Sequence, residues 1–408
     1  MWFNSNKIIL QNYVFLSDWQ KNVTFVKILV MKLNAKTMKG FEGLLEKELK
    51  KLGAVNTEQG NRIVSFEGER DLLYKVNFRS RLALSVLKPL VDIKIETQED
   101  LYEAVSALPW EKIFNVDKKM AIESFCMNSV FTHTQFLSQR TKDAICDRFR
   151  NKMAKRPYID LENPDIKIDV YLYDNRLVLS LNSSGEPLFK RGYRQDTNKA
   201  PINEVLAAGM LALSGWDASV DFFDPMCGSG TILIEACMRA CNMPAQYYRN
   251  DFSFQHWYDF DRILWRNVKE EANEAIADPE CEIFGYDISP RSIAIAEENI
   301  RMARLHKDIS IRMGDFMQLP APSEKGVIVC NPPYGERLNE QNINDLYHGF
   351  GDKLKKDYNG WTAWLISSNE EALKNIGLHC SKKYTLFNGP LECKFERFDM
   401  YEGSKKGN

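Results

Sequence analysis

The residues at positions 331–334 combine a neutral amide, two prolines and an aromatic ring, directly after the apolar run Gly-Val-Ile-Val-Cys. Proline has no backbone N–H, so these residues are not expected to extend a sheet. The side-chain oxygen of Asn331 and the carbonyl of Pro332 could accept the hydrogens of an amino group. Pro333 would stiffen the turn, and Tyr334 could stack on a base. We therefore predict a site that positions the exocyclic amino group of a nucleobase, with a rigid turn that binds nothing as the alternative.

A second motif, DPMCGSGT at positions 224–231, follows one apolar run and precedes an apolar helical pattern. Its two glycines would let a ligand approach the backbone at the carboxyl edge of a sheet. Leu233 stands where a dinucleotide-binding series has its third glycine, and no Gly-Lys-Ser/Thr phosphate grip is present, so we expect a ligand without a pyrophosphate. A tight turn without a ligand is the alternative. The predicted cofactor-binding residues of this turn are Asp224, Pro225, Gly228, Ser229, Gly230 and Thr231.

Acidic residues also end the next two apolar runs, at Asp287 and Asp315. Asp287, followed by Ile288, could accept both hydroxyls of a ribose. Asp315 could accept from an adenine amino group, with Phe316 beside the ring. The alternatives are a carboxylate that supports a helix cap and one that is merely solvated. An unphosphorylated nucleoside with a positive centre near Asp224 fits S-adenosylmethionine, so we predict a methyltransferase that uses this cofactor.

From residue 200 onward, apolar runs alternate with helical patterns. The runs are continuous, which is typical of parallel strands covered on both faces. Strands are expected at 219–224, 282–287, 309–315, 326–331 and 361–368, and helices at 231–241, 290–305, 343–358 and 369–377. Two more strands, joined at Asn388-Gly389, provide an antiparallel end. The pattern predicts an α/β fold with a Rossmann-like, doubly wound, mostly parallel seven-stranded sheet.

Two smaller α+β units are expected before this region. The first has a ferredoxin-like order of elements. The second combines a helix over 135–156, which should bury Ile145, Phe149 and Met153, with a hairpin that turns at Asp174-Asn175. Residues 1–30 lack clear organisation, and we interpret them as an extension. The expected domains are a ferredoxin-like domain at 31–98, an RNA-binding THUMP domain at 99–190 and a methyltransferase domain at 191–408.

The helix over 135–156 carries an excess of positive charge. Seven Lys or Arg stand against two Asp between positions 140 and 156, and four more basic residues follow in 189–199. A solvated helix face is the alternative explanation. Because the whole chain has a net charge of only −2, we favour phosphate binding by these two stretches. The predicted RNA-binding residues are Arg140, Arg148, Arg150, Lys152, Lys155, Arg156, Lys190, Arg191 and Arg194.

The composition narrows the remaining classes of function. The nine cysteines are scattered without a Cys-x-x-Cys pair, which indicates free thiols in a reducing cytoplasm. The five histidines share no spacing, so we expect no metal site. No apolar run approaches the roughly 20 residues that cross a bilayer, so we expect no membrane association. The chain is predicted to be a cytoplasmic protein of ordinary globular composition.

Taken together, these motifs resemble those of the amino-methylating class I methyltransferases, in which [DN]PP[YFW] marks the catalytic loop. The chain is most similar to the THUMP-domain RNA guanine-N2 methyltransferases, including the N-terminal half of the large bacterial 23S rRNA enzyme. The resemblance extends from Val30 to the C-terminus. The segments that carry it are LNAKTMKGFEGLLEKELKKLG, FKRGYRQDTNKAPINEVLAAGML, DPMCGSGTILIEA, FSFQHW and NPPYGERL.

This resemblance implies a transferase active in rRNA processing that methylates N2 of a guanosine, with rRNA favoured over tRNA. It implies that Asp224, Gly228 and Gly230 form the cofactor loop, that Asp287 and Asp315 contact the nucleoside, and that positions 331–334 form the catalytic loop. A tRNA guanine-N2 enzyme and a DNA adenine-N6 enzyme remain alternatives. A different class, an RNA-binding assembly factor without catalysis, is also open.

Overall fold

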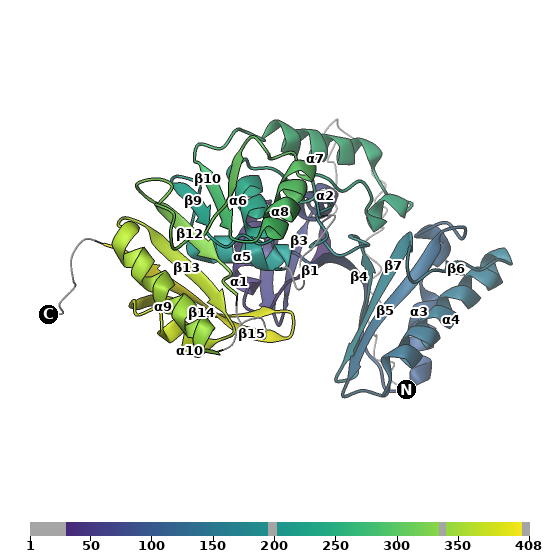
Figure 1. Ribbon diagram of the computed structural model, residues 1–408. Coiled ribbons are helices and arrows are strands. Elements are labelled where there is room, and N and C mark those ends of the chain that lie inside the picture. The colour runs from purple at the N-terminus through teal and green to yellow at the C-terminus, as the bar shows by residue number, and fades with distance from the viewer. Residues whose placement is uncertain (1–29, 195–201, 334–339, 402–408) are drawn as a thin grey trace.

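The computed structural model describes residues 30–194, 202–333 and 340–401, and within them the chain forms two sheets (Figure 1). The predicted extension at 1–30 lies outside the described residues, apart from Val30. The first sheet has eight strands in the order β2-β3-β1-β4-β8-β7-β5-β6. Its elements are β1 (Met31–Lys36), α1 (Glu42–Lys51), β2 (Val55–Gly60), β3 (Ile63–Gly68), α2 (Arg70–Arg79), β4 (Ser85–Lys94), α3 (Gln98–Ala107), η1 (Trp110–Lys112), β5 (Lys119–Met127), α4 (Thr134–Met153), β6 (Tyr158–Ile159), β7 (Ile166–Tyr173) and β8 (Arg176–Asn182).

Strand β4 joins the two predicted N-terminal units into this one sheet. Its first residues, Ser85 to Leu87, pair with β1, and the segment from Leu87 to Lys94 pairs with β8. A strand of ten residues is long enough to serve both neighbours in turn. The ferredoxin-like and THUMP-like parts therefore share a backbone hydrogen-bond network, which their separate sequence patterns did not indicate.

The second sheet has the order β11-β10-β9-β12-β13-β15-β14. Its elements are α5 (Glu204–Ser214), β9 (Asp221–Asp224), α6 (Thr231–Ala240), η2 (Ser253–His256), α7 (Arg262–Glu274), β10 (Ile283–Asp287), α8 (Pro290–Met302), β11 (Ile309–Met313), β12 (Gly326–Cys330), α9 (Glu340–Asp357), β13 (Thr362–Ser367), α10 (Glu370–Lys374), β14 (Cys380–Asn388) and β15 (Leu391–Asp399). The first five strands in the order are parallel to one another, and β15 runs antiparallel to both of its neighbours, β13 and β14. The predicted fold class is thus confirmed.

Both faces of the second sheet are buried, as the continuous apolar runs predicted. Phe222 packs in a core with residues of α5, α6 and α8, whereas Phe223 packs in a second core with residues of α9 and α10. Successive side chains of a strand point to opposite faces, so two adjacent phenylalanines serve two cores. This arrangement leaves the carboxyl ends of the strands as the open edge of the sheet.

Several local signals behave as expected, and one does not. Asp174 and Asn175 both have positive φ angles, at 47° and 60°, as a two-residue hairpin turn requires. In α4, Ile145 and Phe149 are fully buried, but Met153 is 46% exposed. The prediction for Met153 was wrong because the helix ends there, with Ala154 in the left-handed conformation.

Candidate functional site

The turn between β9 and α6 holds two glycines in left-handed conformations. Gly228 has φ +57° and Gly230 has φ +78°, which other residues adopt only with strain. A Cβ on Gly230 would lie 3.3 Å from Cβ of Ala296 on α8, whereas a Cβ on Gly228 would meet no heavy atom within 4 Å. Gly230 therefore serves helix packing, and Gly228 leaves an open space beside the turn.

Asp287, the last residue of β10, connects to this turn. Its Oδ2 accepts a hydrogen bond from the Gly228 N–H at 2.9 Å, and its Oδ1 accepts from the Ser289 N–H at 2.8 Å. The Ser289 hydroxyl separately caps α8 by accepting from the Ser292 N–H. The carboxylate thus holds the glycine turn against β10. Next to it, Ile288 is 70% exposed at the open edge of the sheet.

Asp224 lies beneath the turn and is only 1% exposed. Burial raises its pKa to about 7, and the negative charge of Asp287 acts in the same direction. The Met226 N–H, which donates to Asp224 Oδ1 at 3.2 Å, and the Cys330 side chain oppose this rise in pKa. A carboxyl group with this pKa is partly protonated near neutral pH, and a nearby cation would favour its charged form.

Asp315 follows β11 at the same edge of the sheet. Its Oδ1 accepts from the Met317 N–H at 2.9 Å, and its Oδ2 accepts from the Gln318 side chain at 3.2 Å. The ring of Phe316 is 2% exposed and packs 4.4 Å from the ring of Phe350, measured between centroids. The expectation that this ring lies beside a ligand is corrected, because the ring belongs to the core under α9.

Asn331 follows β12, which lies beside β9. The register pairs Ile328 with Phe223, so continuing it places Asn331 two residues, roughly 7 Å, beyond the level of Asp224. On the other side of β9, Gly285 pairs with Asp224, which places Asp287 at a similar height. These three residues therefore surround the end of β9, the position at which the glycine turn begins.

The side-chain oxygen of Asn331 is buried and has no hydrogen-bond partner among the described residues. A buried acceptor without a partner is costly, which makes it a candidate for contact with a ligand. The next residue, Pro332, is buried, and Pro333 is half-buried. Tyr334 lies outside the described residues. The described part of the loop thus offers a buried acceptor oxygen on the residue that precedes two prolines.

The predicted RNA-binding residues fall into three groups. Side chains of the first group form ion pairs: Arg140 with Glu99, Arg148 with Glu111, Arg150 with Asp147 and Lys190 with Glu186. A second group, Lys152, Lys155 and Arg156, is exposed around the end of α4. Arg150 and Lys190 are exposed despite their partners, so five of the nine cations lie on the surface.

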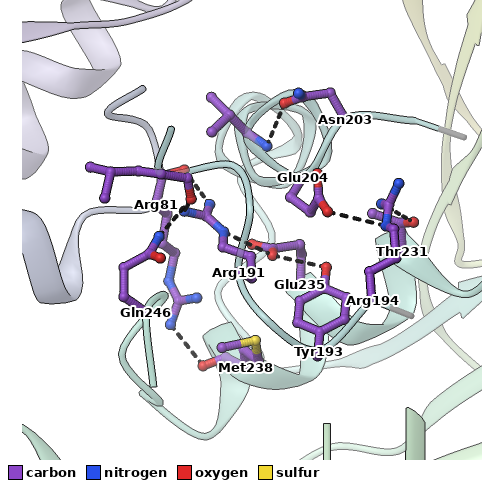
Figure 2. Close-up of polar contacts among 12 residues, drawn as sticks. Arg81, Arg191, Tyr193, Arg194, Asn203, Glu204, Thr231, Glu235, Met238 and Gln246 are labelled. Atoms are coloured by element: carbon purple, nitrogen blue, oxygen red, sulfur yellow. Dashed lines mark hydrogen bonds and ion pairs between the residues drawn. The ribbon is translucent and has the colours of Figure 1, made fainter. Parts of the chain in front are cut away.

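Arg191 and Arg194 form the third group, and the prediction that these two side chains bind phosphate is wrong, because both are engaged inside the protein. The Arg191 side chain is fully buried; its Nε lies 3.3 Å from Glu235 Oε1, and its Nη2 donates to the Arg81 carbonyl at 2.7 Å (Figure 2). The Tyr193 hydroxyl donates to the same Glu235 oxygen at 3.2 Å. Charges that seemed to face a phosphate instead join the N-terminal sheet region to helix α6.

Arg194 points toward the start of the same helix. Its Nη2 donates to Thr231 Oγ1 at 2.8 Å, and its Nε lies 3.1 Å from Glu204 Oε1 (Figure 2). The same Nη2 also donates to the Ile202 carbonyl at 3.0 Å. Burial raises the pKa of Glu204, and the Arg194 charge opposes that rise. Arg194 therefore ties α5 to the first residue of α6, directly after the glycine turn.

The sequence contained one signal for this buried network. Glu235 is a lone charged residue within the apolar helix segment TILIEACM, and its side chain is fully buried. Such a residue requires a buried cation as a partner. The ion-pair partner, Arg191, lies 44 positions away, and the charge of Arg81, 154 positions away, also acts on Glu235, so the pairing itself was visible only in the folded chain.

Metal binding and membrane insertion each require a particular arrangement of residues. Within residues 30–194, 202–333 and 340–401, no group of three or more His, Cys, Asp or Glu is arranged to hold a metal ion. In the same residues, no helix has both the length and the apolar character needed to cross a bilayer.

Three family models match the chain. An RMKL-like methyltransferase domain matches residues 191–397, a THUMP domain matches 96–182, and an RlmL ferredoxin-like domain matches 32–87. A Synechocystis sp. protein provisionally named an RNA methyltransferase is 34% identical, over 90% of this chain and 96% of its own length. Ribosomal RNA large subunit methyltransferases K/L of Shewanella frigidimarina and Syntrophotalea carbinolica are 34% and 37% identical, over 90% and 91% of this chain. The match spans only about half of these two relatives, at 52% and 54% of their length.

Solved structures show the same fold. SMU.472, crystallised with SAH, has a TM-score of 0.83 and 28% identity, and the match covers 92% of this chain and 99% of that one. A predicted N6-adenine-specific DNA methylase from Listeria monocytogenes also has a TM-score of 0.83 and 28% identity, with 93% and 99% covered. TrmN from Thermus thermophilus, at 18% identity and a TM-score of 0.64 over 91% and 99%, shares the fold.

Proposed function

This chain belongs to the RMKL-like methyltransferase family, and from that premise we propose that it transfers a methyl group from S-adenosylmethionine to the exocyclic N2 of a guanosine in large-subunit ribosomal RNA. Its family makes it an S-adenosylmethionine-dependent methyltransferase. The base, the atom and the RNA are the proposed part. We also propose that residues 31–98, 99–190 and 191–408 form its ferredoxin-like, THUMP and catalytic domains.

The residues at the end of β9 fit this cofactor. The space beside Gly228, into which a Cβ would project freely, admits a ligand against the backbone. Each Asp287 oxygen accepts one backbone hydrogen bond and keeps a second lone pair for a ribose hydroxyl. In this proposal Asp315 would accept from an adenine amino group, and Asp224 would favour the positive end of the molecule. The bound cofactor supplies a methyl group on a sulfonium, which is readily transferred.

The unpartnered oxygen of Asn331 is the observation that carries the proposal. The nitrogen of a base amino group is a poor nucleophile, because its lone pair is delocalised into the ring. Acceptors that hold the two amino hydrogens, namely Asn331 Oδ1 and the Pro332 carbonyl, would orient this nitrogen without strong base catalysis. A neutral amide suits this role because the acceptor needs no charge. Pro332 and Pro333 would keep both oxygens in place.

Two observations bear on the identity of the nucleic acid and of its methylated base. The K/L relatives are named for large-subunit ribosomal RNA, which supports RNA as the substrate. The Listeria monocytogenes neighbour is described as specific for N6 of adenine in DNA, so a DNA adenine enzyme is the second candidate. The exposed cations around the end of α4 would contact phosphates of either nucleic acid. Their position beside a helix of the separate N-terminal sheet region supports a folded RNA, with rRNA favoured over tRNA.

The test is transfer of labelled methyl groups from S-adenosylmethionine to ribosomal RNA, tRNA and DNA from cells that lack the protein. Nucleoside analysis of each product identifies the modified atom. The expected product is N2-methylguanosine in large-subunit RNA. N2-methylguanosine in tRNA, or N6-methyladenine in DNA, would replace the proposal with the corresponding alternative. Absence of transfer to all three, by protein that binds the cofactor, would contradict the proposed reaction.

A further inference from the structure

One face of the N-terminal sheet exposes a row of large apolar side chains. Helices α3 and α4 cover the other face (Figure 1), where Ile168, Val170 and Leu172 of β7 are buried. The alternate residues of β7, Tyr171 and Tyr173, point to the open face and are 49% and 39% exposed. On β5, Phe125 and Met127 are 45% and 51% exposed and pair in register with these tyrosines. Four exposed side chains therefore form a continuous patch.

The aromatic rings in this patch are nearly parallel. Phe125 and Tyr171 have centroids 5.3 Å apart and planes inclined by 11°. Tyr171 and Tyr173 have centroids 6.4 Å apart and planes inclined by 20°. The paired strands hold these rings in fixed positions, so binding of a flat ligand restricts them little further. Stacked, half-exposed rings on a rigid sheet are suited to π-stacking with a nucleobase.

Positive charge continues the row across the sheet. Tyr173 pairs with Arg176 of β8, which pairs with Lys94 of β4, so all three side chains share the open face. The Arg176 side chain is 68% exposed and forms a double hydrogen bond with Asp92. Lys94 is exposed and forms no ion pair among the described residues. The aromatic patch is thus bordered by a cation that is available to a phosphate.

We infer that this patch, made of Phe125, Met127, Tyr171 and Tyr173, binds unpaired bases of the RNA substrate by stacking, while Lys94 contacts the adjoining phosphate. The inference rests on the proposed function, because it assumes an RNA substrate. A protein partner fits less well, because the centre of a protein interface is depleted of charged residues. Here Lys94 and Arg176 lie in the same row as the aromatic side chains, and the two tyrosines add polar hydroxyl groups to the surface. Bases combined with phosphates match both parts of the surface.

The experiment uses the full chain and a fluorescein-labelled 12-nucleotide oligouridylate, with binding measured by fluorescence anisotropy. The double variant Tyr171→Ala/Tyr173→Ala should bind about tenfold or more weakly, because each substitution removes stacking on a base. Tyr171→Phe/Tyr173→Phe keeps both rings and should bind as the parent does. Phe136→Ala is the matched control, since Phe136 is 44% exposed on α4, on the opposite side of the sheet.

The salt dependence separates stacking from charge. Lys94→Ala should reduce the slope of log K against log salt by about 0.7, as expected for one phosphate contact on a single strand. The double alanine variant should keep the parent slope while its affinity falls. Unchanged affinity of that variant would overturn the inference. The inference would also be overturned if the parent sediments as a dimer and the double alanine variant as a monomer while RNA binding stays the same. That result would make the face a protein interface.

Methyl transfer to ribosomal RNA, measured in parallel, separates this inference from the proposed function. If the parent protein methylates the RNA and the double alanine variant does so equally well with unchanged affinity, the patch is not a base-binding surface and the proposed function stands. If the oligonucleotide result is as expected but the parent methylates no ribosomal RNA, the patch stands as a base-binding surface and the proposed substrate is wrong.

Discussion

The Gly228 N–H donates a hydrogen bond to Asp287 Oδ2 at 2.9 Å, and this contact connects the turn after β9 to the end of β10 across 59 residues of sequence. A carboxylate expected to face a ribose thus also shapes the loop beside which that ribose would lie. If Asp287 binds the ribose as proposed, one side chain couples cofactor binding to loop geometry.

Asp287→Asn should weaken S-adenosylmethionine binding by roughly 10- to 100-fold. The amide provides a single acceptor oxygen where the carboxylate serves both the Gly228 and Ser289 N–H groups, and a charged hydrogen bond contributes roughly 1.5–3 kcal/mol. Isothermal titration calorimetry measures the change. Glu297→Gln, on the exposed surface of α8, is the matched control and should bind normally. Parent-like affinity of Asp287→Asn would contradict the assigned role.

Asn331→Ala should lower kcat by roughly 10²-fold or more while S-adenosylmethionine affinity stays unchanged. The amide oxygen is expected to orient the substrate amino group, and removal of one preorganised polar group at a reacting centre has effects of about this size. Single-turnover methylation assays measure the rate. The variant should unfold at the same denaturant concentration as the parent, since Oδ1 has no hydrogen-bond partner among the described residues. If the variant instead unfolds at a clearly lower denaturant concentration than the parent, the loss of activity would indicate a structural role for Asn331.

Asp224 should make stability fall as pH rises. Its folded-state pKa of about 7 lies above the ordinary value of 3.8, so its favourable contribution is complete below pH 4 and is lost as pH rises through 7. The loss amounts to at most about 4 kcal/mol. Asp224→Asn should remove this dependence, so the free energy of unfolding of the variant should exceed that of the parent increasingly from pH 4 to 8. Denaturant titrations at several pH values test this, and parallel curves would contradict it.

The same carboxyl group should make cofactor binding depend on pH. A cationic ligand near Asp224 favours the ionised form, so binding should release a proton and S-adenosylmethionine should bind more tightly at pH 8 than at pH 6. Calorimetry in buffers of different ionisation enthalpy counts the released protons. Proton uptake, or no exchange at all, would place the positive centre elsewhere.

Lys190 and Arg191 are adjacent, and their substitution should affect stability to very different extents. Arg191→Met should lower the free energy of unfolding by about 3–5 kcal/mol, because it leaves the buried Glu235 charge without its partner. Lys190→Met removes an exposed pair with Glu186 and should change stability by at most about 1 kcal/mol. Denaturant unfolding compares the two variants. Equal effects on stability would show that burial does not distinguish them.

The exposed cations of α4 should govern the salt dependence of RNA binding. Replacing Lys152, Lys155 and Arg156 with alanine should reduce the slope of log K against log salt by up to about 0.9 for each duplex phosphate that these cations neutralise. Arg148→Ala serves as the comparison, because its side chain already donates two hydrogen bonds to Glu111. An equal slope for the triple variant and the parent would remove this surface from the RNA-binding site.

The sequence by itself determined the parts that depend on neighbouring residues. Apolar runs marked the parallel strands of the second sheet, Gly228 and Gly230 marked its tight turn, and Asp174-Asn175 marked a hairpin. In each case the chemistry of a few consecutive residues decides the local backbone. The ends of these strands then identified Asp224, Asp287 and Asn331 as site candidates, since carboxyl ends of parallel strands share an edge.

Only the tertiary structure decided which residues meet across long sequence separations. It showed that β4 joins two units in one sheet, that Arg191 pairs with Glu235 inside the protein, and that the Phe316 ring lies in the core. The identity of a basic residue does not reveal whether its side chain faces solvent or a buried acid. Its environment is set by packing with distant segments, and this packing also determines the aromatic patch and the unpartnered oxygen of Asn331.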